Sequence, residues 1–74
     1  MIMIQVNNMA DIANLVREAR KNQGISQTVL AQLSNVGLRF VCEVEHGKNT
    51  VRFDKLLPVL TSLGITLQLE MPPE

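Results

Sequence analysis

Aromatic residues are almost missing from this chain, which has no tryptophan, no tyrosine and two phenylalanines. Its core must therefore be aliphatic. The chain has 74 residues, enough for one small domain. A domain of this size buries only about 60% of the surface that its unfolded chain exposes, so a single core is marginal. Either short helices pack economically, or a second copy of the chain supplies the missing burial.

Cysteine is equally scarce, because Cys42 is the only one. A lone thiol excludes an intrachain disulfide and a cysteine-based metal cluster, and it fits a reducing cytoplasm. The sequence has no apolar run of the roughly 20 residues that a membrane-spanning helix needs. Its first residues, MIMIQV, have no basic flank or cleavage-type segment, so we expect no signal peptide. These features predict a cytoplasmic protein without a membrane partner.

Net charge is absent as well, because seven Lys and Arg balance seven Asp and Glu. A domain that binds nucleic acid is usually basic as a whole, so the total charge does not favour that function. The basic residues are spread along the chain without a block of like charge. We therefore expect modest affinity for a polyanion, strengthened by dimerisation.

Apolar residues at helical spacing predict a first helix over residues 9–23. Asn8 supplies its N-cap, Asp11 lies in its first turn, and Gly24 ends it. The apolar stripe of this helix comprises Ile12, Leu15, Val16 and Ala19.

Two shorter helices follow, separated by a tight turn. Ser26 caps the first, which opens at Gln27, and Asn35 lies where the chain needs a left-handed residue. Gly37 caps the second, predicted over residues 38–46. The positions expected to face inward are Leu30, Ala31, Leu33, Val41 and Val44, with Phe40 or Leu38 beside them and Val36 filling the turn. The positions expected to face outward on the second helix are Arg39, Cys42, Glu43 and His46.

A fourth helix is predicted from Arg52 or Phe53 up to Gly64, with Thr50 as a candidate cap. Pro58 lies early in this helix, so we expect a bend rather than a break. The residues that give its periodicity are Phe53, Leu56, Leu57, Leu60 and Leu63.

After Gly64 the apolar residues alternate, which predicts a half-buried strand. Its apolar face comprises Ile65, Leu67, Leu69 and Met71. A lone strand leaves unpaired backbone groups, and the simplest partner is the same strand of a second copy. We therefore predict an all-α domain of four or five helices with a C-terminal dimerising β-strand. Its parts are an N-terminal arm (1–8), the helical domain (9–64), the strand (65–71) and a short tail (72–74).

The run ISQTVLAQLSNVGLRFVCEVEHGKNT resembles the helix-turn-helix motif of Xre/Cro-type repressors. The positions that match are Ser26, Gln27, Leu30, Ala31, Val36, Val44, Glu45, Gly47 and Lys48. More narrowly, the arrangement LVREARKNQGISQ…RFVCEVEHGK…LTSLGITLQL is similar to HipB-type antitoxins. The resemblance implies a lambda-repressor-like fold and a homodimer on a palindromic operator in double-stranded DNA. It also implies a HipA-like kinase toxin as a protein partner.

The same resemblance assigns roles to individual residues. Bases would be read by Leu38, Arg39, Cys42 and Glu43, with Arg39 the foremost because arginine can bridge guanine O6 and N7. Phosphates would be held by Gln27, Thr28, Gly37, Lys48 and Asn49, with Thr50 as a further candidate. Arg20 and Glu45 match a pair that forms a structural salt bridge beneath the motif. The chain departs from the family pattern at Gly37, where Ser or Thr is usual, and at Asn35, where Gly is usual.

Two other functions stay open at this stage. Zero net charge, Gly37 and an apolar recognition helix are compatible with a protein-interaction module that neutralises a partner without specific DNA binding. An ordinary repressor without a toxin fits the sequence equally well. Catalysis has little support, because His46 and Cys42 have no third orienting group and no Gly-rich phosphate loop is present. We expect no enzyme, no cofactor and no metal site.

Overall fold

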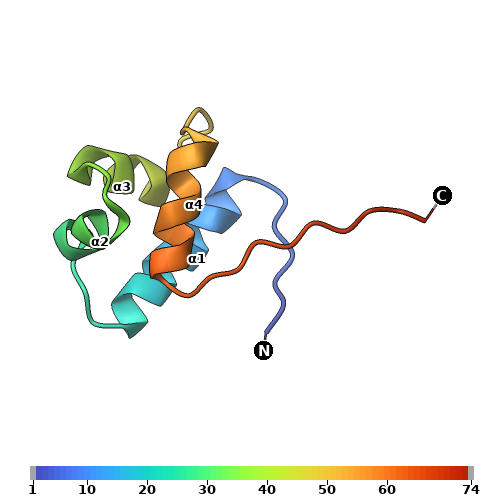
Figure 1. The fold of residues 1–74 in the computed structure, drawn as a ribbon, viewed down its shortest axis with the longest axis horizontal. Coiled ribbons are helices and arrows are strands. Elements are labelled where there is room, and N and C mark those ends of the chain that lie inside the picture. The colour runs from blue at the N-terminus through green and yellow to red at the C-terminus, as the bar shows by residue number, and fades with distance from the viewer. Residues whose placement is uncertain (1, 74) are drawn as a thin grey trace.

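The structure, a computed structural model, describes residues 2–73. Four helices lie in this range: α1 (Met9–Asn22), α2 (Gln27–Ser34), α3 (Leu38–Glu45) and α4 (Phe53–Ser62). α2 packs against α3 and α4, and α1 packs against α3 (Figure 1). The all-α prediction is confirmed, with four helices. No helix among these residues is long and apolar enough to cross a membrane.

Side chains cap the first two helices at the predicted positions. Asn8 Oδ1 accepts a hydrogen bond from the backbone N–H of Asp11 at 3.0 Å, and Ser26 Oγ accepts one from Val29 at 3.1 Å. The prediction of Thr50 as the cap of α4 is wrong. Arg52 occupies that position without a side-chain cap, and its carbonyl accepts the first helical bond, from the N–H of Leu56. α4 then continues through Pro58 to Ser62.

Asn35 makes the tight turn between α2 and α3. It is the only non-glycine residue with positive φ among residues 2–73, at φ 55° and ψ 44°. Its N–H bonds back to carbonyls of α2, and the N–H of Val36 donates to Ala31 O at 3.0 Å. The left-handed conformation predicted here is confirmed, and it sets the angle at which α3 leaves α2.

Replacing Asn35 with alanine is expected to lower the free energy of unfolding by about 1 kcal/mol, because a β-carbon disfavours the left-handed region. Asn35→Gly is the matched variant, and it should keep or raise the stability since glycine adopts this conformation freely. Urea unfolding followed by circular dichroism measures both. An equal loss in the two variants would show that the asparagine side chain, not the backbone conformation, is what stabilises the turn.

The core lies where the four helices meet. Its fully buried large side chains are Val16, Leu30, Val41, Val44, Leu56 and Val59. Leu33, expected to face inward, is 61% exposed. The buried positions of α2 are Leu30, Ala31 and Ser34, which share one face of the helix, and Leu33 points away from it. Ser34, not Leu33, is buried at this position, and Ser34 Oγ lies 3.0 Å from Ser62 Oγ on α4.

Two residues of the predicted α4 stripe also lie outside the core. Phe53 and Leu57 are exposed, whereas Val59 is buried although the stripe did not include it. The buried face of α4 therefore comprises Leu56, Val59 and Leu60, and Leu63 continues it just after the helix.

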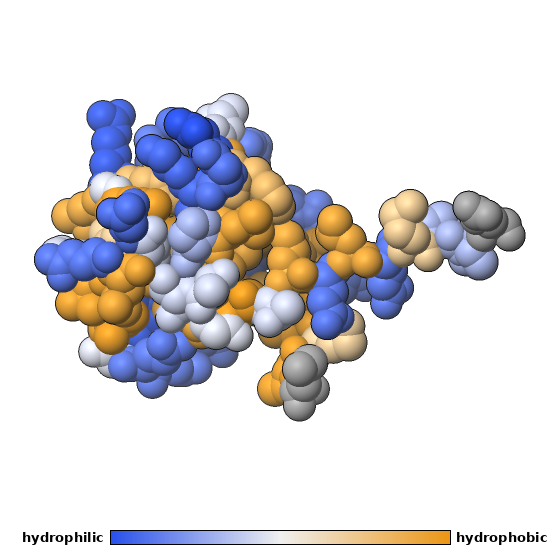
Figure 2. Space-filling view, viewed as in Figure 1, coloured by the Kyte–Doolittle hydropathy of each residue, from blue (hydrophilic) through white to orange (hydrophobic). Residues whose placement is uncertain are grey.

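The C-terminal segment forms no strand within the described residues. From Ile65 to Pro73 it is an arm without regular structure, and residues 2–7 form a second arm on the same side of the helical body (Figure 1). A strand needs a neighbour to complete its ladder, and none of residues 2–73 supplies one. Apolar side chains remain uncovered along both arms (Figure 2).

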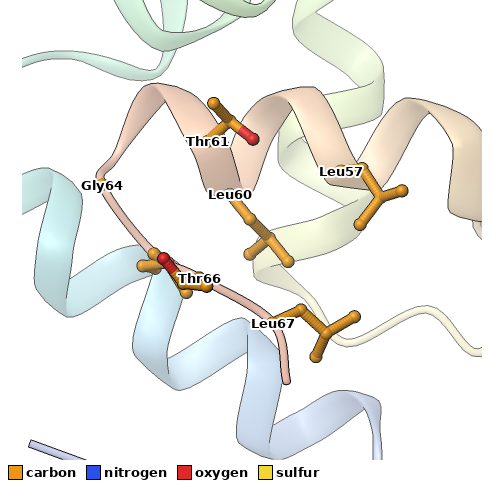
Figure 3. A pocket seen from close by; sticks show the side chains of 7 residues that line it. Leu57, Leu60, Thr61, Gly64, Thr66 and Leu67 are labelled. Carbon is orange, nitrogen blue, oxygen red and sulfur yellow. The ribbon is translucent and has the colours of Figure 1, made fainter. Parts of the chain in front are cut away.

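The C-terminal arm begins beside α4. It turns at Gly64 and runs back along the helix, so that Leu67 faces Leu57 and Leu60 (Figure 3). A hollow of about 250 Å³ lies between these residues. Of the predicted apolar face, Ile65 packs against the core, whereas Leu67, Leu69 and Met71 are exposed.

Candidate nucleic-acid interface

The α2–turn–α3 unit presents one face of α3 to solvent. Val41, Val44 and Glu45 are buried against the rest of the domain, whereas the side chain of Arg39 is 92% exposed. Leu38 and His46 are also exposed, and Cys42 and Glu43 are half-buried at the edge of this face. The outward stripe expected from periodicity is therefore present, although Cys42 is turned partly inward.

Arg20 on α1 and Glu45 at the end of α3 form a buried ion pair. Arg20 Nε donates to Glu45 Oε2 at 2.7 Å, and Arg20 Nη2 donates to Oε1 at 3.0 Å. The side chain of Glu45 is 3% exposed and that of Arg20 13%. Hydrogen bonding to Glu45 raises the pKa of Arg20 above its usual value. The pair fixes the orientation of α3 against α1.

Further groups converge on Glu45 and were not foreseen from the sequence. Gln27 Nε2 donates to Glu45 Oε1 at 3.2 Å, and Cys42 Sγ donates to Gln27 Oε1 at 3.6 Å. Arg17, one turn before Arg20, donates to the backbone carbonyl of Glu45 at 2.6 Å. The side chain of Gln27, expected to hold a phosphate, thus lies in this internal network. The spacing of Arg17 and Arg20 on one helix face is the only signal in the sequence for this network around Glu45.

A second cluster, here called the α3 charge cluster, comprises Arg39, Glu43 and Lys48. Lys48 Nζ donates to Glu43 Oε2 at 2.9 Å, and Arg39 Nε lies 3.7 Å from the same oxygen. The hydrogen bond from Lys48 lowers the pKa of Glu43 below its usual value. The cluster brings two cations from a helix and the following loop to one carboxylate on the exposed side of α3.

The start of α3 is open. Gly37 gives no side-chain cap, and the N–H groups of Leu38 and Arg39 have no acceptor among residues 2–73. A β-carbon at Gly37 would meet nothing within 4 Å, so a capping serine would fit there. Free N–H groups at a helix start attract anions. Thr28, at the start of α2, and Asn49, after α3, are exposed.

Within residues 2–73 no three His, Cys, Asp or Glu side chains are placed to hold a metal ion. His46 Nδ1 lies 2.7 Å from the carbonyl oxygen of Cys42, one turn earlier in the chain. The His46 ring is thus in contact with the backbone of Cys42, and the Cys42 thiol donates to Gln27.

Two short helices joined by a left-handed turn, the second with a charged exposed face, define a helix-turn-helix domain. Residues 16–69 match the family model HTH_3, described as helix-turn-helix. The chain belongs to this family of Xre-type helix-turn-helix proteins. An uncharacterised HTH-type transcriptional regulator of Sinorhizobium fredii, y4mF, is 41% identical over 70 residues, which cover 95% of this chain and 92% of the relative.

Solved structures share the fold at low sequence identity. The HipA–HipB–O2–O3 complex contains a chain that matches with a TM-score of 0.84 at 17% identity, covering 96% of this chain and 100% of that one. A HipB–O4 20mer complex matches with a TM-score of 0.83 at 17% identity and the same coverage. A mutant of the restriction-modification controller protein C.Esp1396I matches at 0.70 and 17%, covering 85% of this chain and 80% of that one.

Proposed function

We propose that the protein is a sequence-specific DNA-binding transcriptional repressor that binds a palindromic operator as a homodimer and acts as the antitoxin of a HipA-like kinase toxin. The observation that carries the proposal is the exposed, arginine-bearing face of α3 beside the open start of that helix. The relative y4mF is described as a transcriptional regulator, and a HipB chain of similar fold is described in complexes with a 20mer and with HipA.

In this proposal α3 lies in the major groove. Arg39, whose side chain is 92% exposed, bridges guanine O6 and N7, and Glu43 accepts from a cytosine amino group. Leu38 and Cys42 contact thymine methyl groups. Phosphates are held at the start of α2 by Gln27 and Thr28, at the open start of α3 by Gly37, and beyond α3 by Lys48 and Asn49.

Because the side-chain amide of Gln27 bonds to Glu45, its phosphate contact is assigned to the backbone N–H. The N–H groups of Gln27 and Thr28 have no acceptor among residues 2–73. The first turn of α2 therefore has the donors that a phosphate oxygen requires.

The dimer is proposed to form through the C-terminal arm. Leu67, Leu69 and Met71 are exposed in one copy, and pairing of two arms as strands would cover them and complete the backbone ladder. Ile65 anchors the start of the arm on the core. To bind a palindromic operator, such a dimer must place its two α3 helices about 34 Å apart, in successive major grooves.

A second candidate function is a protein-interaction module that neutralises a partner without specific DNA binding. Zero net charge and the exposed apolar residues Leu33, Leu38 and Phe53 favour it. An ordinary repressor without a toxin is distinguished from an antitoxin by the gene neighbourhood, since a kinase gene in the same operon marks the latter.

Arg39→Ala is expected to reduce the preference of the protein for its operator about tenfold or more, because a bidentate arginine–guanine contact is lost. Fluorescence anisotropy over a salt series measures this. The duplexes are the DNA upstream of the gene, the best duplex enriched from a random pool, and a scrambled sequence. Lys21→Ala removes one exposed positive charge from α1 and serves as the control.

Binding no tighter to either candidate operator than to scrambled DNA, with Arg39→Ala unchanged, would favour the interaction module. If Arg39→Ala and Lys21→Ala lowered the affinity for every duplex equally, the protein would be attracted to DNA by its positive charge alone. Both outcomes contradict base reading by α3.

A further inference from the structure

Glu43 lies between the two cations of the proposed DNA interface. Its Oε2 accepts from Lys48 at 2.9 Å and lies 3.7 Å from Arg39 Nε, so one oxygen serves both. Its Oε1 has no hydrogen-bond partner among residues 2–73. The carboxylate is only half-buried at the edge of the exposed α3 face, within reach of a ligand that approaches this face.

A carboxylate in this position competes with DNA for the same cations. Every duplex presents phosphates, and a phosphate can draw Lys48 away from Glu43 whatever the base sequence. The carboxylate is then left against a polyanion without its cation, which opposes binding. Only a base edge that offers a hydrogen-bond donor, such as the amino group of cytosine, compensates for the lost partner.

The charge cluster therefore acts differently on two kinds of DNA. On a non-specific duplex, the separation of Lys48 from Glu43 is uncompensated, so binding is weakened. On an operator with a donor next to Oε1, a new hydrogen bond replaces the internal one. The affinities for operator and for non-specific DNA therefore move apart, and the specificity arises from weakened binding of the wrong duplex.

We infer that Glu43 is a specificity-determining residue. It competes with DNA phosphates for Lys48 and Arg39, and it thereby weakens binding to every duplex that places no hydrogen-bond donor beside the Glu43 carboxylate. The inference rests on the proposed function and deepens it. Glu43 thus has a role in the free protein as well as in the complex, because it holds the two cations in place before DNA arrives.

The test is Glu43→Gln in the full chain, titrated by fluorescence anisotropy with operator and with scrambled duplex at several salt concentrations. The glutamine keeps the size of the side chain and removes its charge. Affinity for scrambled DNA is expected to rise about fivefold, the upper range for release of an exposed ion pair. Affinity for the operator should rise less or fall, so that the ratio of the two affinities decreases.

Two matched variants separate this effect from bulk charge. Glu18→Gln makes the same change on the exposed side of α1. Asp54→Asn removes the carboxylate of another exposed ion pair, with Arg52 at 2.6 Å. Both should leave the ratio of operator to scrambled affinity unchanged. Circular dichroism of all three variants verifies that the fold is retained.

Three results would overturn the inference while leaving the proposed function intact. The first is that Glu43→Gln raises the affinity for both duplexes equally, and the second is that it does not raise the affinity for scrambled DNA. The third is that Glu18→Gln lowers the ratio of operator to scrambled affinity by the same amount. A wild-type protein that does not distinguish operator from scrambled DNA would overturn both. The two failures are distinguishable because the wild-type ratio is measured in the same titrations.

Discussion

Replacing Arg20 with alanine is expected to lower the free energy of unfolding by about 3–5 kcal/mol, the range observed when one partner of a buried ion pair is removed. Glu45 is 3% exposed, so without Arg20 its carboxylate is buried with Gln27 as its remaining side-chain partner. A domain of this length has a total stability of roughly 4–11 kcal/mol, so the variant loses much of it. Urea unfolding followed by circular dichroism measures the change.

Two further variants isolate the cause. Arg20→Met combined with Glu45→Leu removes both charges, and it should recover much of the loss because no uncompensated charge stays buried. Arg52→Ala breaks the exposed pair with Asp54 and should change stability little, since both side chains are about two-thirds exposed. A near-wild-type stability for Arg20→Ala would contradict the structural role of the pair.

The Arg20–Glu45 pair also shows what spacing alone could not predict. The two residues are far apart in the sequence, and periodicity places each on a helix without relating the two helices. The resemblance to Xre-type repressors supplied the pairing, and the structure places the atoms 2.7 Å apart. The contacts of Gln27 and Arg17 with Glu45 escaped both arguments, because they depend on how α2 and α1 each pack against α3.

Local signals in the sequence predicted the helices well. Asn8 and Ser26 as caps and Asn35 as the left-handed turn residue are short-range features, set by each residue's own hydrogen bonds and backbone preference. The bounds of the first three helices differ from the predicted ones by at most one residue. Thr50 failed as a cap because α4 begins two residues later, where the carbonyl of Arg52 accepts the first helical hydrogen bonds, from the N–H groups of Lys55 and Leu56.

Orientation within short helices was predicted less well. An eight-residue helix has about two turns, so a leucine at its edge fits an inward or an outward stripe almost equally. Leu33 was placed inward for this reason, whereas the buried position belongs to Ser34, which bonds to Ser62. A polar residue at a helix–helix contact is not visible in a hydrophobic pattern, because its partner is remote in sequence.

The charge cluster on α3 was not predicted, although the sequence contains a signal for half of it. Arg39 and Glu43 are one turn apart, which favours an ion pair on a helix surface. Lys48 lies beyond the helix end, and its approach to Glu43 depends on the turn that follows α3. From the sequence Glu43 was therefore predicted as an outward-facing residue and a candidate base reader, and its position between two cations became evident from the geometry.

The alternating apolar pattern of residues 65–71 favours a strand, but these residues form no strand in one copy of the chain. Leu69 is 84% exposed, and the apolar side chains at Leu67 and Met71 are likewise uncovered. An isolated extended segment gains no ladder bonds and buries no face, so it stays irregular. Pairing with the arm of a second copy would provide both, which makes the oligomeric state the decisive measurement for this segment.

Removing residues 65–74 is therefore expected to convert a dimer to a monomer and to weaken operator binding strongly, because a monomer contacts only one half-site.

Leu69→Lys in the full chain gives the sharper test, since Leu69 contributes little to the fold of one copy. Each dimer would lose two buried leucines of about 1.5–3 kcal/mol each, so the dimer dissociation constant should rise about a hundredfold or more. Gln68→Lys, on the opposite face of the alternating pattern, is the matched control and should leave the dimer intact. Sedimentation velocity measures all three proteins, and dimers that survive both the truncation and Leu69→Lys would place the interface outside the arm.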